Sequence, residues 1–245
     1  MRTLKLVIEY DGFDYHGWQV QDHAVTIQGV IEAALEKILG EPIRVNGAGR
    51  TDAKVHALGQ VASLRCPTDI PTTALQRALN AVLPRDIVVH EVRDVPADFH
   101  ARFSALGKVY VYRILNRPVR AALRLRYVWH LPHALDVPSM ALAGTCLQGT
   151  HDFTSFQGTG SEVRTTERTL TELTVACTAD EIVITCTANG FLRHMVRNIV
   201  GTLVEVGRGA RPPADLKRIL DGRDRRLAGA TAPPQGLYLT QVLYP

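Results

Sequence analysis

The chain has no apolar run that approaches the roughly 20 residues of a membrane-spanning helix, and its mean hydropathy is near zero. Residues 1–10 alternate as a strand does, and they lack the apolar stretch and small-residue cleavage site of a signal peptide. These absences predict a protein that stays in the cytoplasm and has no membrane partner.

Cysteine is scarce and no metal-binding pattern is present. No two of the four cysteines have C-x-x-C spacing: Cys66, Cys146, Cys177 and Cys186. In a chain without an export signal, this spacing predicts reduced core residues and not a disulfide framework. His130 and His133 have H-x-x-H spacing, but no cysteine or carboxylate pattern accompanies them. We therefore predict no metal site.

What the chain does have is a mild positive charge. The net charge is +4, and most of the 28 basic residues are arginine. The planar guanidinium fork of arginine suits phosphate and base contacts. The excess is consistent with a polyanionic partner, and equally with a solvated basic surface.

Apolar periodicity predicts an α+β fold. Thr26 is a candidate N-cap for a helix over 27–38 that ends at Gly40 and Pro42. A strong amphipathic pattern predicts another helix over 191–206, with Arg193 and Arg197 on one face. Shorter helices are expected over 73–82, 138–147 and 214–220, and strands over 1–10, 42–46, 61–65, 87–92, 109–114, 181–186 and 237–243. This order favours two related α/β halves, 1–100 and 101–245, with mainly antiparallel sheets whose faces meet at a central cleft.

The segment 47–57, GAGRTDAKVHA, contains the most informative residues. It has no G-K-[ST] phosphate loop, and Asp52 stands where a dinucleotide fingerprint needs glycine. The expected turn over 47–52 presents Arg50 and Asp52 two residues apart. Such a carboxylate can act as a nucleophile, stabilise a cation or transfer a proton. Spacing alone leaves open, and by itself favours, a helix N-cap at Thr51 or Asp52.

Residues 49–57 resemble the catalytic motif of the tRNA pseudouridine synthase A family. Four further blocks are similar to this family in the expected order and span nearly the whole chain: residues 6–19, 98–104 with 110–112, 191–203 and 232–239. The resemblance implies two α/β halves with a basic cleft for RNA, and a homodimer in which one tRNA contacts both subunits. It implies isomerisation of uridine to pseudouridine in the anticodon stem-loop, at conventional tRNA positions 38, 39 and 40. Because nothing is added or oxidised, no cofactor is expected.

The family pattern also implies roles for individual residues. Asp52 is the expected nucleophile, and Arg197 is the expected cation that offsets the burial of its charge. Without the resemblance to the family, the sequence indicates only a surface or structural arginine at position 197. Arg50 is expected to fill the space that a flipped uridine leaves in the stack, or, alternatively, to contact a phosphate.

Tyr110 matches the tyrosine that stacks on the uracil and helps to remove the C5 proton. Strand alternation alone predicts a half-buried core residue there, and Tyr112 points the same way. Arg193 and Lys54 are the other expected RNA contacts. Lys54 is a departure, because the family usually has glycine two residues after the aspartate. We expect an ordinary backbone at Lys54, with its ammonium on a phosphate.

Two other functions compete with this interpretation. The first is a catalytically silent tRNA-binding or folding factor, against which the combined presence of Asp52, Arg197 and Tyr110 argues. The second is a glycosidase-like hydrolase with two carboxylates. No motif places a second acid, which argues against the hydrolase.

Overall fold

The computed structural model describes residues 1–160 and 163–245, and these form two compact units. Unit 1 contains residues 1–106 and 238–245, and unit 2 contains residues 107–237. The predicted halves differ from this division mainly at the C-terminus. The last strand belongs with unit 1, because it pairs with a strand of that unit.

The sheet of unit 1 has the order β4-β1-β3-β10. Strand β1 (Arg2–Tyr10) pairs antiparallel with both β3 (His56–Cys66) and β4 (Ile87–Val95). The C-terminal strand β10 (Leu237–Leu243) pairs parallel with the start of β3, and the short β2 (Asn46–Gly47) pairs antiparallel with its second half. Strand β2 leads directly into the segment that carries Asp52.

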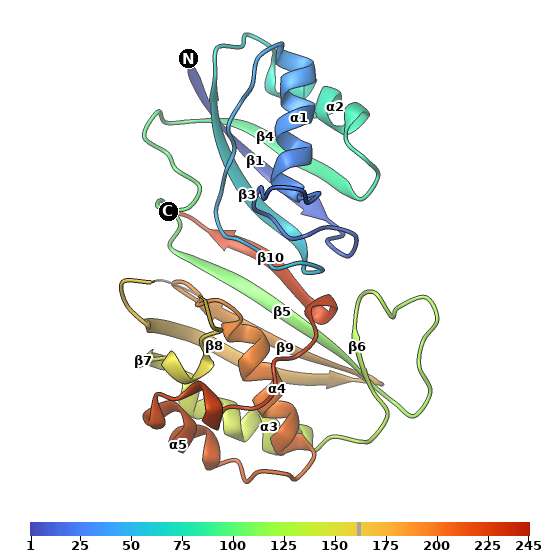
Figure 1. The fold of residues 1–245 in the computed structure, drawn as a ribbon, viewed down its shortest axis with the longest axis vertical. Helices are drawn as coiled ribbons and strands as arrows, with labels where there is room; N and C mark the ends of the chain where they lie inside the picture. The colour runs from blue at the N-terminus through green and yellow to red at the C-terminus, as the bar shows by residue number, and fades with distance from the viewer. Residues whose placement is uncertain (161–162) are drawn as a thin grey trace. The chain divides into compact units, whose positions relative to one another are not determined.

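Two helices, α1 (Ile27–Leu39) and α2 (Thr72–Val82), cover one face of this sheet (Figure 1). Thr26 caps α1 by accepting a hydrogen bond from the Gly29 amide, and Gly40 ends it with φ of 77°. Both ends of this helix are confirmed, because the N-cap and C-cap are local chemistry.

The two faces of the sheet differ in composition. Leu4, Leu6 and Ile8 of β1 are fully buried on the helix side. Since side chains alternate between faces, the opposite face carries Thr3 and Lys5, and their partners Arg65 and Ser63 on β3. We call this the open face of unit 1, because no helix of the unit lies on it.

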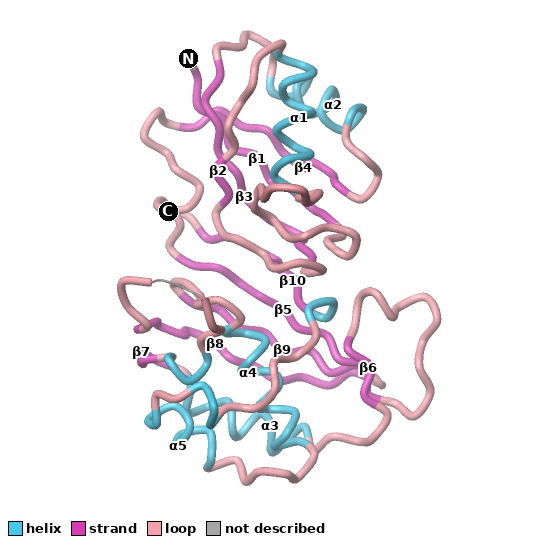
Figure 2. The backbone as a smooth tube through the Cα atoms, in the orientation of Figure 1, coloured by secondary structure: helices cyan, strands magenta, loops and turns pink. Residues whose placement is uncertain are grey.

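The sheet of unit 2 has the order β5-β9-β8-β7 with antiparallel neighbours (Figure 2). Its strands are β5 (Gly107–Asn116), β9 (Glu181–Ala188), β8 (Glu167–Thr178) and β7 (Gly149–Asp152), and β6 (Trp129–Leu131) pairs parallel with β5. Helices α3 (Val137–Gly144), α4 (Met195–Gly207) and α5 (Asp215–Gly222) complete the unit. The predicted α+β fold with mainly antiparallel strands is confirmed.

Two predicted elements need correction, and β8 was missed. Of the strand expected over 42–46, only Asn46 pairs with β3; Ile43 and Val45 are buried by packing without strand pairing. The helix expected from 191 begins at Met195, because His194 has the left-handed φ of 59°. Strand β8 was not predicted. A bulge between Leu170 and Glu172 shifts its register, so the buried Leu170 and Leu173 are three residues apart and do not alternate.

Two further findings concern the cysteines and the helices. All four cysteines are free thiols; Cys66 and Cys186 are buried as expected, whereas Cys177 is exposed. Among the residues that the structure describes, no helix has the length and apolar character needed to cross a membrane.

Candidate active site

Asp52 lies in a loop of unit 1, residues 48–55, which joins β2 to β3 and which we call the aspartate loop. The Val55 amide donates to the Asp52 carbonyl oxygen at 3.2 Å, which closes a four-residue turn. Asp52 is half-buried and is followed by this turn and then directly by β3. The helix N-cap interpretation of Thr51 and Asp52 is therefore wrong, and the turn begins later than the expected 47–52.

The backbone at Lys54 is left-handed, with φ of 66°, whereas Ala53 is not in the positive-φ region. Lys54 is therefore the third residue of a type II turn, the position at which glycine is favoured. The predicted ordinary backbone at Lys54 is wrong. Its ammonium lies 5.2 Å from the centre of the Phe13 ring, and this cation–π contact offsets part of the backbone strain.

The left-handed backbone at Lys54 predicts that glycine is more stable there than alanine, which reverses the usual order of these two residues. Lys54→Gly should unfold with a free energy about 1 kcal/mol higher than Lys54→Ala, because only glycine avoids the steric strain of left-handed φ. Both variants lose the Phe13 contact, so the comparison isolates the backbone. Urea unfolding measures the difference.

The neighbouring Ala53 provides the control for this comparison. Ala53→Gly should lower the free energy of unfolding by about 0.4–1 kcal/mol, because glycine gains unfolded-state entropy where φ is ordinary. If Lys54→Ala proved the more stable of the two Lys54 variants, the type II turn would be refuted.

The N-terminal loop, residues 11–19, holds the aspartate loop from one side. The Trp18 amide donates to the Thr51 carbonyl at 3.0 Å, and the Lys54 amide donates to the Tyr15 carbonyl at 3.3 Å. Gly17 has φ of 90°, and a Cβ there would lie 2.5 Å from the Thr51 carbonyl oxygen. Only glycine fits this approach, which gives Gly17, within the sequence block 6–19, a structural reason.

A buried polar network holds the loop from the other side. The Thr51 hydroxyl lies 2.8 Å from the Tyr10 hydroxyl, and the Gln60 amide donates to the Gly49 carbonyl at 2.8 Å and to the Tyr10 oxygen at 3.4 Å. Burial raises the pKa of Tyr10 to about 12, although the hydrogen bonds from Thr51 and Gln60 oppose this shift. The phenol therefore stays neutral, and the backbone on the N-terminal side of Asp52 is fixed.

Sequence reasoning assigned no role to Tyr10 or Gln60. A signal was available, since Gln60 is a polar residue among buried neighbours on β3 and is itself 0% exposed. Buried polar side chains need partners, but the sequence does not say that the partner lies 50 positions away.

His56 anchors the end of the loop. Its side chain is buried, the Gly12 amide donates to its Nδ1 at 3.2 Å, and the Asp11 carboxylate lies 3.0 Å from the same nitrogen. The imidazole also stacks on Tyr238, with ring centres 4.9 Å apart. Arg50, in contrast, is exposed. Among residues 1–160 and 163–245 no ion pair or hydrogen bond of its side chain occurs.

Arg197 of unit 2 lies in the first turn of α4 and is half-buried. Its Nε donates to the Ala232 carbonyl at 2.8 Å, and the Ala232 amide donates to the Arg197 carbonyl at 3.1 Å. The first bond holds its guanidinium and the second holds its backbone, so Arg197 is not a freely solvated surface arginine.

Arg193 lies before α4 and is exposed. The prediction that it shares a helix face with Arg197 is wrong, because the left-handed His194 separates it from the helix. Its Nη1 donates to the carbonyls of Thr159 and Gly160 at 3.0 and 3.1 Å. These two bonds use the same guanidinium nitrogen and hold the side chain of Arg193 against this segment.

Tyr110 and Tyr112 are both buried on the same face of β5, as their alternation predicts. Tyr110 packs edge-on against Phe191, with ring centres 5.0 Å apart. The Tyr112 hydroxyl donates to the Pro233 carbonyl at 2.7 Å, and burial raises its pKa although the positive charge of Arg197 opposes this shift. The Tyr112 hydroxyl therefore has a structural hydrogen bond to the backbone.

No cluster of metal ligands accompanies these residues. Within the described parts of the chain, His, Cys, Asp and Glu side chains nowhere gather in a group of three that could hold a metal ion. Unit 1 offers a half-buried carboxylate at Asp52 and an exposed arginine at Arg50, and unit 2 offers a half-buried arginine at Arg197 and a buried tyrosine at Tyr110.

Comparisons with known proteins assign the chain to a family. The tRNA pseudouridine synthase family profile matches residues 6–104 and 143–245. The chain is 48% identical to a tRNA pseudouridine synthase A of Thermoanaerobacter sp. (strain X514) and 49% identical to one of Brevibacillus brevis, with all of each chain covered. Among solved structures, a Cbf5–Nop10–Gar1 complex aligns at 15% identity with a TM-score of 0.36, over 82% of this chain and 54% of that one. Since the profile covers both units and nearly half of all positions are identical over the full length, the chain belongs to the tRNA pseudouridine synthase A family.

Proposed function

We propose that the chain isomerises uridine to pseudouridine at positions 38, 39 and 40 of the tRNA anticodon stem-loop, with Asp52 as the nucleophile. One observation carries the proposal: Asp52 opens a turn that the buried Tyr10–Thr51–Gln60 network and the N-terminal loop hold from both sides. Such fixation aims a carboxylate at a reacting atom. A protein that only binds tRNA does not need it.

The reaction is an internal transfer. The bond between ribose C1′ and base N1 breaks while Asp52 acts as nucleophile toward the reacting nucleotide, and the base then turns and joins C1′ through C5. N1 ends with a proton and C5 loses one, so the product is an isomer of the substrate. No oxidant, reductant or added group enters this balance.

The remaining residues serve this transfer in distinct ways. Arg197 supplies the cation that pairs with the Asp52 carboxylate, and its bond to Ala232 supports this role by fixing the guanidinium. Arg50, which is exposed, fills the vacancy of the flipped base. Tyr110 stacks on the uracil and helps to remove the C5 proton. Arg193 and Lys54 contact backbone phosphates.

The family also supports three broader proposals. The enzyme works as a homodimer in which one tRNA contacts both subunits. It works in the cytoplasm, where tRNA is modified. The two α/β halves form the basic cleft that takes the anticodon stem-loop.

Position mapping tests the proposed substrate. Three tRNA transcripts, each with uridine at only one of positions 38, 39 and 40, should each gain one pseudouridine at that position. Chemical adduct formation followed by primer extension locates the product. A transcript with cytidine at all three positions is the control and should stay unmodified; pseudouridine elsewhere in it would contradict the proposed site.

A further inference from the structure

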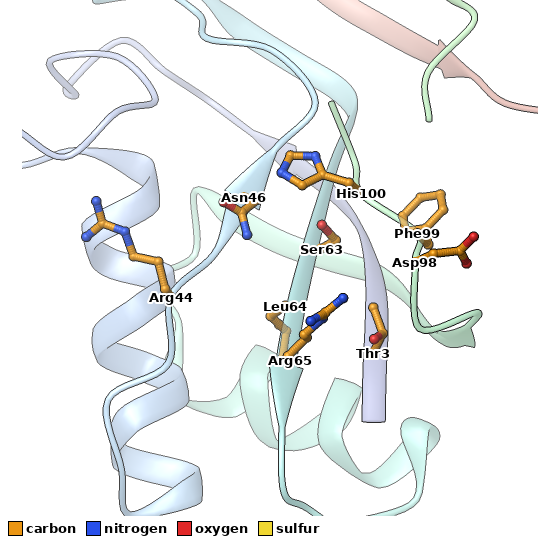
Figure 3. Close-up of a pocket in the computed structure, with 9 residues that line it drawn as sticks. All are labelled: Thr3, Arg44, Asn46, Ser63, Leu64, Arg65, Asp98, Phe99 and His100. Carbon is orange, nitrogen blue, oxygen red and sulfur yellow. The ribbon is translucent and has the colours of Figure 1, made fainter. Parts of the chain in front are cut away.

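Unit 2 contains a group of polar side chains that has no role in the function proposed above. It differs from the hollow on the open face of unit 1, which is lined by β1, β3 and the segment that follows β4 (Figure 3). In that hollow, Arg44 lies 3.8 Å from a Glu32 carboxylate oxygen. Arg65 donates to the Ala97 carbonyl, so both arginines have partners within unit 1. The polar group of unit 2, in contrast, is bonded to the segment that holds Arg197.

Arg225, Asn198 and Thr231 form a closed triangle of hydrogen bonds. Nη2 of Arg225 donates to Oδ1 of Asn198 at 3.0 Å and to the Thr231 hydroxyl oxygen at 3.1 Å. The Thr231 hydroxyl donates to the same Oδ1 at 2.6 Å. Asn198 is 0% exposed, and its Nδ2 donates to the Phe156 carbonyl at 2.8 Å. Both polar atoms of this buried amide are therefore bonded, and each member of the triangle is oriented by the other two.

Segment 228–232 lies directly on the backbone of α4. A Cβ at Gly201 would lie 1.7 Å from the Ala230 carbonyl oxygen, so only glycine permits this close approach. The Gly229 amide donates to the Thr202 hydroxyl at 2.9 Å. Together with the triangle, these contacts fix the segment relative to the first two turns of α4.

The same segment holds the guanidinium of Arg197. The Arg197 Nε donates to the Ala232 carbonyl at 2.8 Å, and Ala232 directly follows Thr231 in the sequence. On the helix, Arg197 directly precedes Asn198. The bond within the triangle and the bond to Ala232 therefore join the same two backbone segments, one position apart. If the first bond is lost, the Ala232 carbonyl is free to shift, and the guanidinium shifts with it.

We propose that the three residues of this triangle are positioning residues, which hold the Arg197 guanidinium in the orientation that lets it pair with Asp52. The inference rests on the proposed function for the pairing itself. The triangle does not touch the reacting nucleotide and acts through the Ala232 carbonyl. A displacement of about 1 Å within a site can lower a rate on the order of a hundredfold, so a bond that orients this cation affects turnover.

Thr231→Val tests the proposal, with Thr231→Ser as its matched partner. Valine keeps the branched shape and removes the hydroxyl, whereas serine keeps the hydroxyl. In single turnovers with excess enzyme at saturating tRNA, we expect Thr231→Val to lower the rate about tenfold without a change in Kd. Thr231→Ser should match the unaltered enzyme. Urea unfolding identifies a temperature at which all of these proteins are folded.

Two further variants complete this series. Arg225→Lys keeps the positive charge and loses the planar fork that bridges the other two side chains, so it should lower the rate as Thr231→Val does. Thr145→Val is the control. The Thr145 hydroxyl donates to the Leu142 carbonyl at 2.7 Å at the end of α3, so this variant loses a threonine hydrogen bond elsewhere in unit 2 and should keep full turnover.

Arg197→Lys separates positioning from stability. Lysine keeps the positive charge but lacks the guanidinium Nε that binds the Ala232 carbonyl, so the triangle no longer acts on the charge. Thr231→Val should therefore have little further effect on turnover in the Arg197→Lys background. A residue that only stabilises the fold would lower turnover by the same factor in both backgrounds.

Hydrogen exchange reports on the same bond without any need for activity. The Arg197 Nε–H resonance, assigned in nitrogen-15 spectra by its loss in Arg197→Lys, should exchange slowly with water because it is bonded to a backbone carbonyl. Its exchange should become faster in Thr231→Val and stay slow in Thr231→Ser.

The outcomes separate this inference from the proposed function. If the unaltered enzyme forms pseudouridine but Thr231→Val lowers turnover equally in both Arg197 backgrounds, or changes neither turnover nor exchange, the positioning role is wrong and the proposed function stands. If Thr231→Val weakens tRNA binding and leaves exchange slow, Thr231 contacts RNA and the inference is overturned. If the unaltered enzyme forms no pseudouridine, the proposed function is wrong; faster exchange in Thr231→Val still supports the positioning of Arg197, and unchanged exchange overturns it.

Discussion

Asp52→Asn should abolish pseudouridine formation and leave tRNA affinity within a few fold. The substitution keeps the shape of the side chain and removes its charge, so the nucleophile is lost while the buried network around Thr51 stays intact. Loss of a nucleophile lowers turnover by a factor on the order of 10⁴. Single-turnover kinetics with excess enzyme measure the chemical step, and filter binding measures affinity.

A second acid provides the control for this experiment. Asp22 is exposed and lies in the segment before α1, so Asp22→Asn makes the same change of net charge at a residue outside the aspartate loop. It should leave turnover unchanged. Residual turnover of Asp52→Asn within tenfold of the unaltered enzyme would end the nucleophile assignment.

Tyr110→Phe should lower turnover by a factor of about 10²–10⁴ with little change in tRNA binding. The phenyl ring keeps the stacking face and the contact with Phe191, whereas the hydroxyl that assists proton removal is lost. The same single-turnover assay measures this loss, and binding measured separately shows whether stacking is retained.

Tyr112→Phe gives the contrasting result. It removes the hydrogen bond to the Pro233 carbonyl, so the free energy of unfolding should fall by about 0.5–1.5 kcal/mol. Turnover should stay close to normal at a temperature where the variant is folded. An inactive Tyr112→Phe beside a fully active Tyr110→Phe would exchange the roles of the two tyrosines.

Features set by local chemistry could be predicted from the sequence. The ends of α1 depend on Thr26 and Gly40, each within a turn of the helix, and both were predicted. The left-handed Lys54 was missed for the opposite reason. Its conformation is imposed by contacts with the N-terminal loop, where the Lys54 amide binds the Tyr15 carbonyl, and a lysine by itself gives no sign of positive φ.

The support of the site depends on contacts between distant positions. Gln60 of β3 reaches Tyr10 of the neighbouring β1, and although a glutamine among buried residues indicates that a partner exists, the sequence does not identify Tyr10 as that partner. The bulge in β8 likewise forms through pairing with its partner β9, and it interrupts the alternation of buried residues in β8. From the sequence alone, this segment could not be distinguished from a loop. Asp52, Arg50 and Arg197 could be named from the sequence, but only through the family motif.

Release of tritium from a tRNA transcript labelled at C5 of uridine tests the central claim most directly. Because C5 must lose its hydrogen when it joins C1′, every isomerised uridine releases one tritium to water. We predict release by the unaltered enzyme that reaches the stoichiometry of the uridines at positions 38, 39 and 40, without cofactor, and no release by Asp52→Asn. Tight tRNA binding by the unaltered enzyme without tritium release would contradict the account and favour a silent tRNA-binding protein.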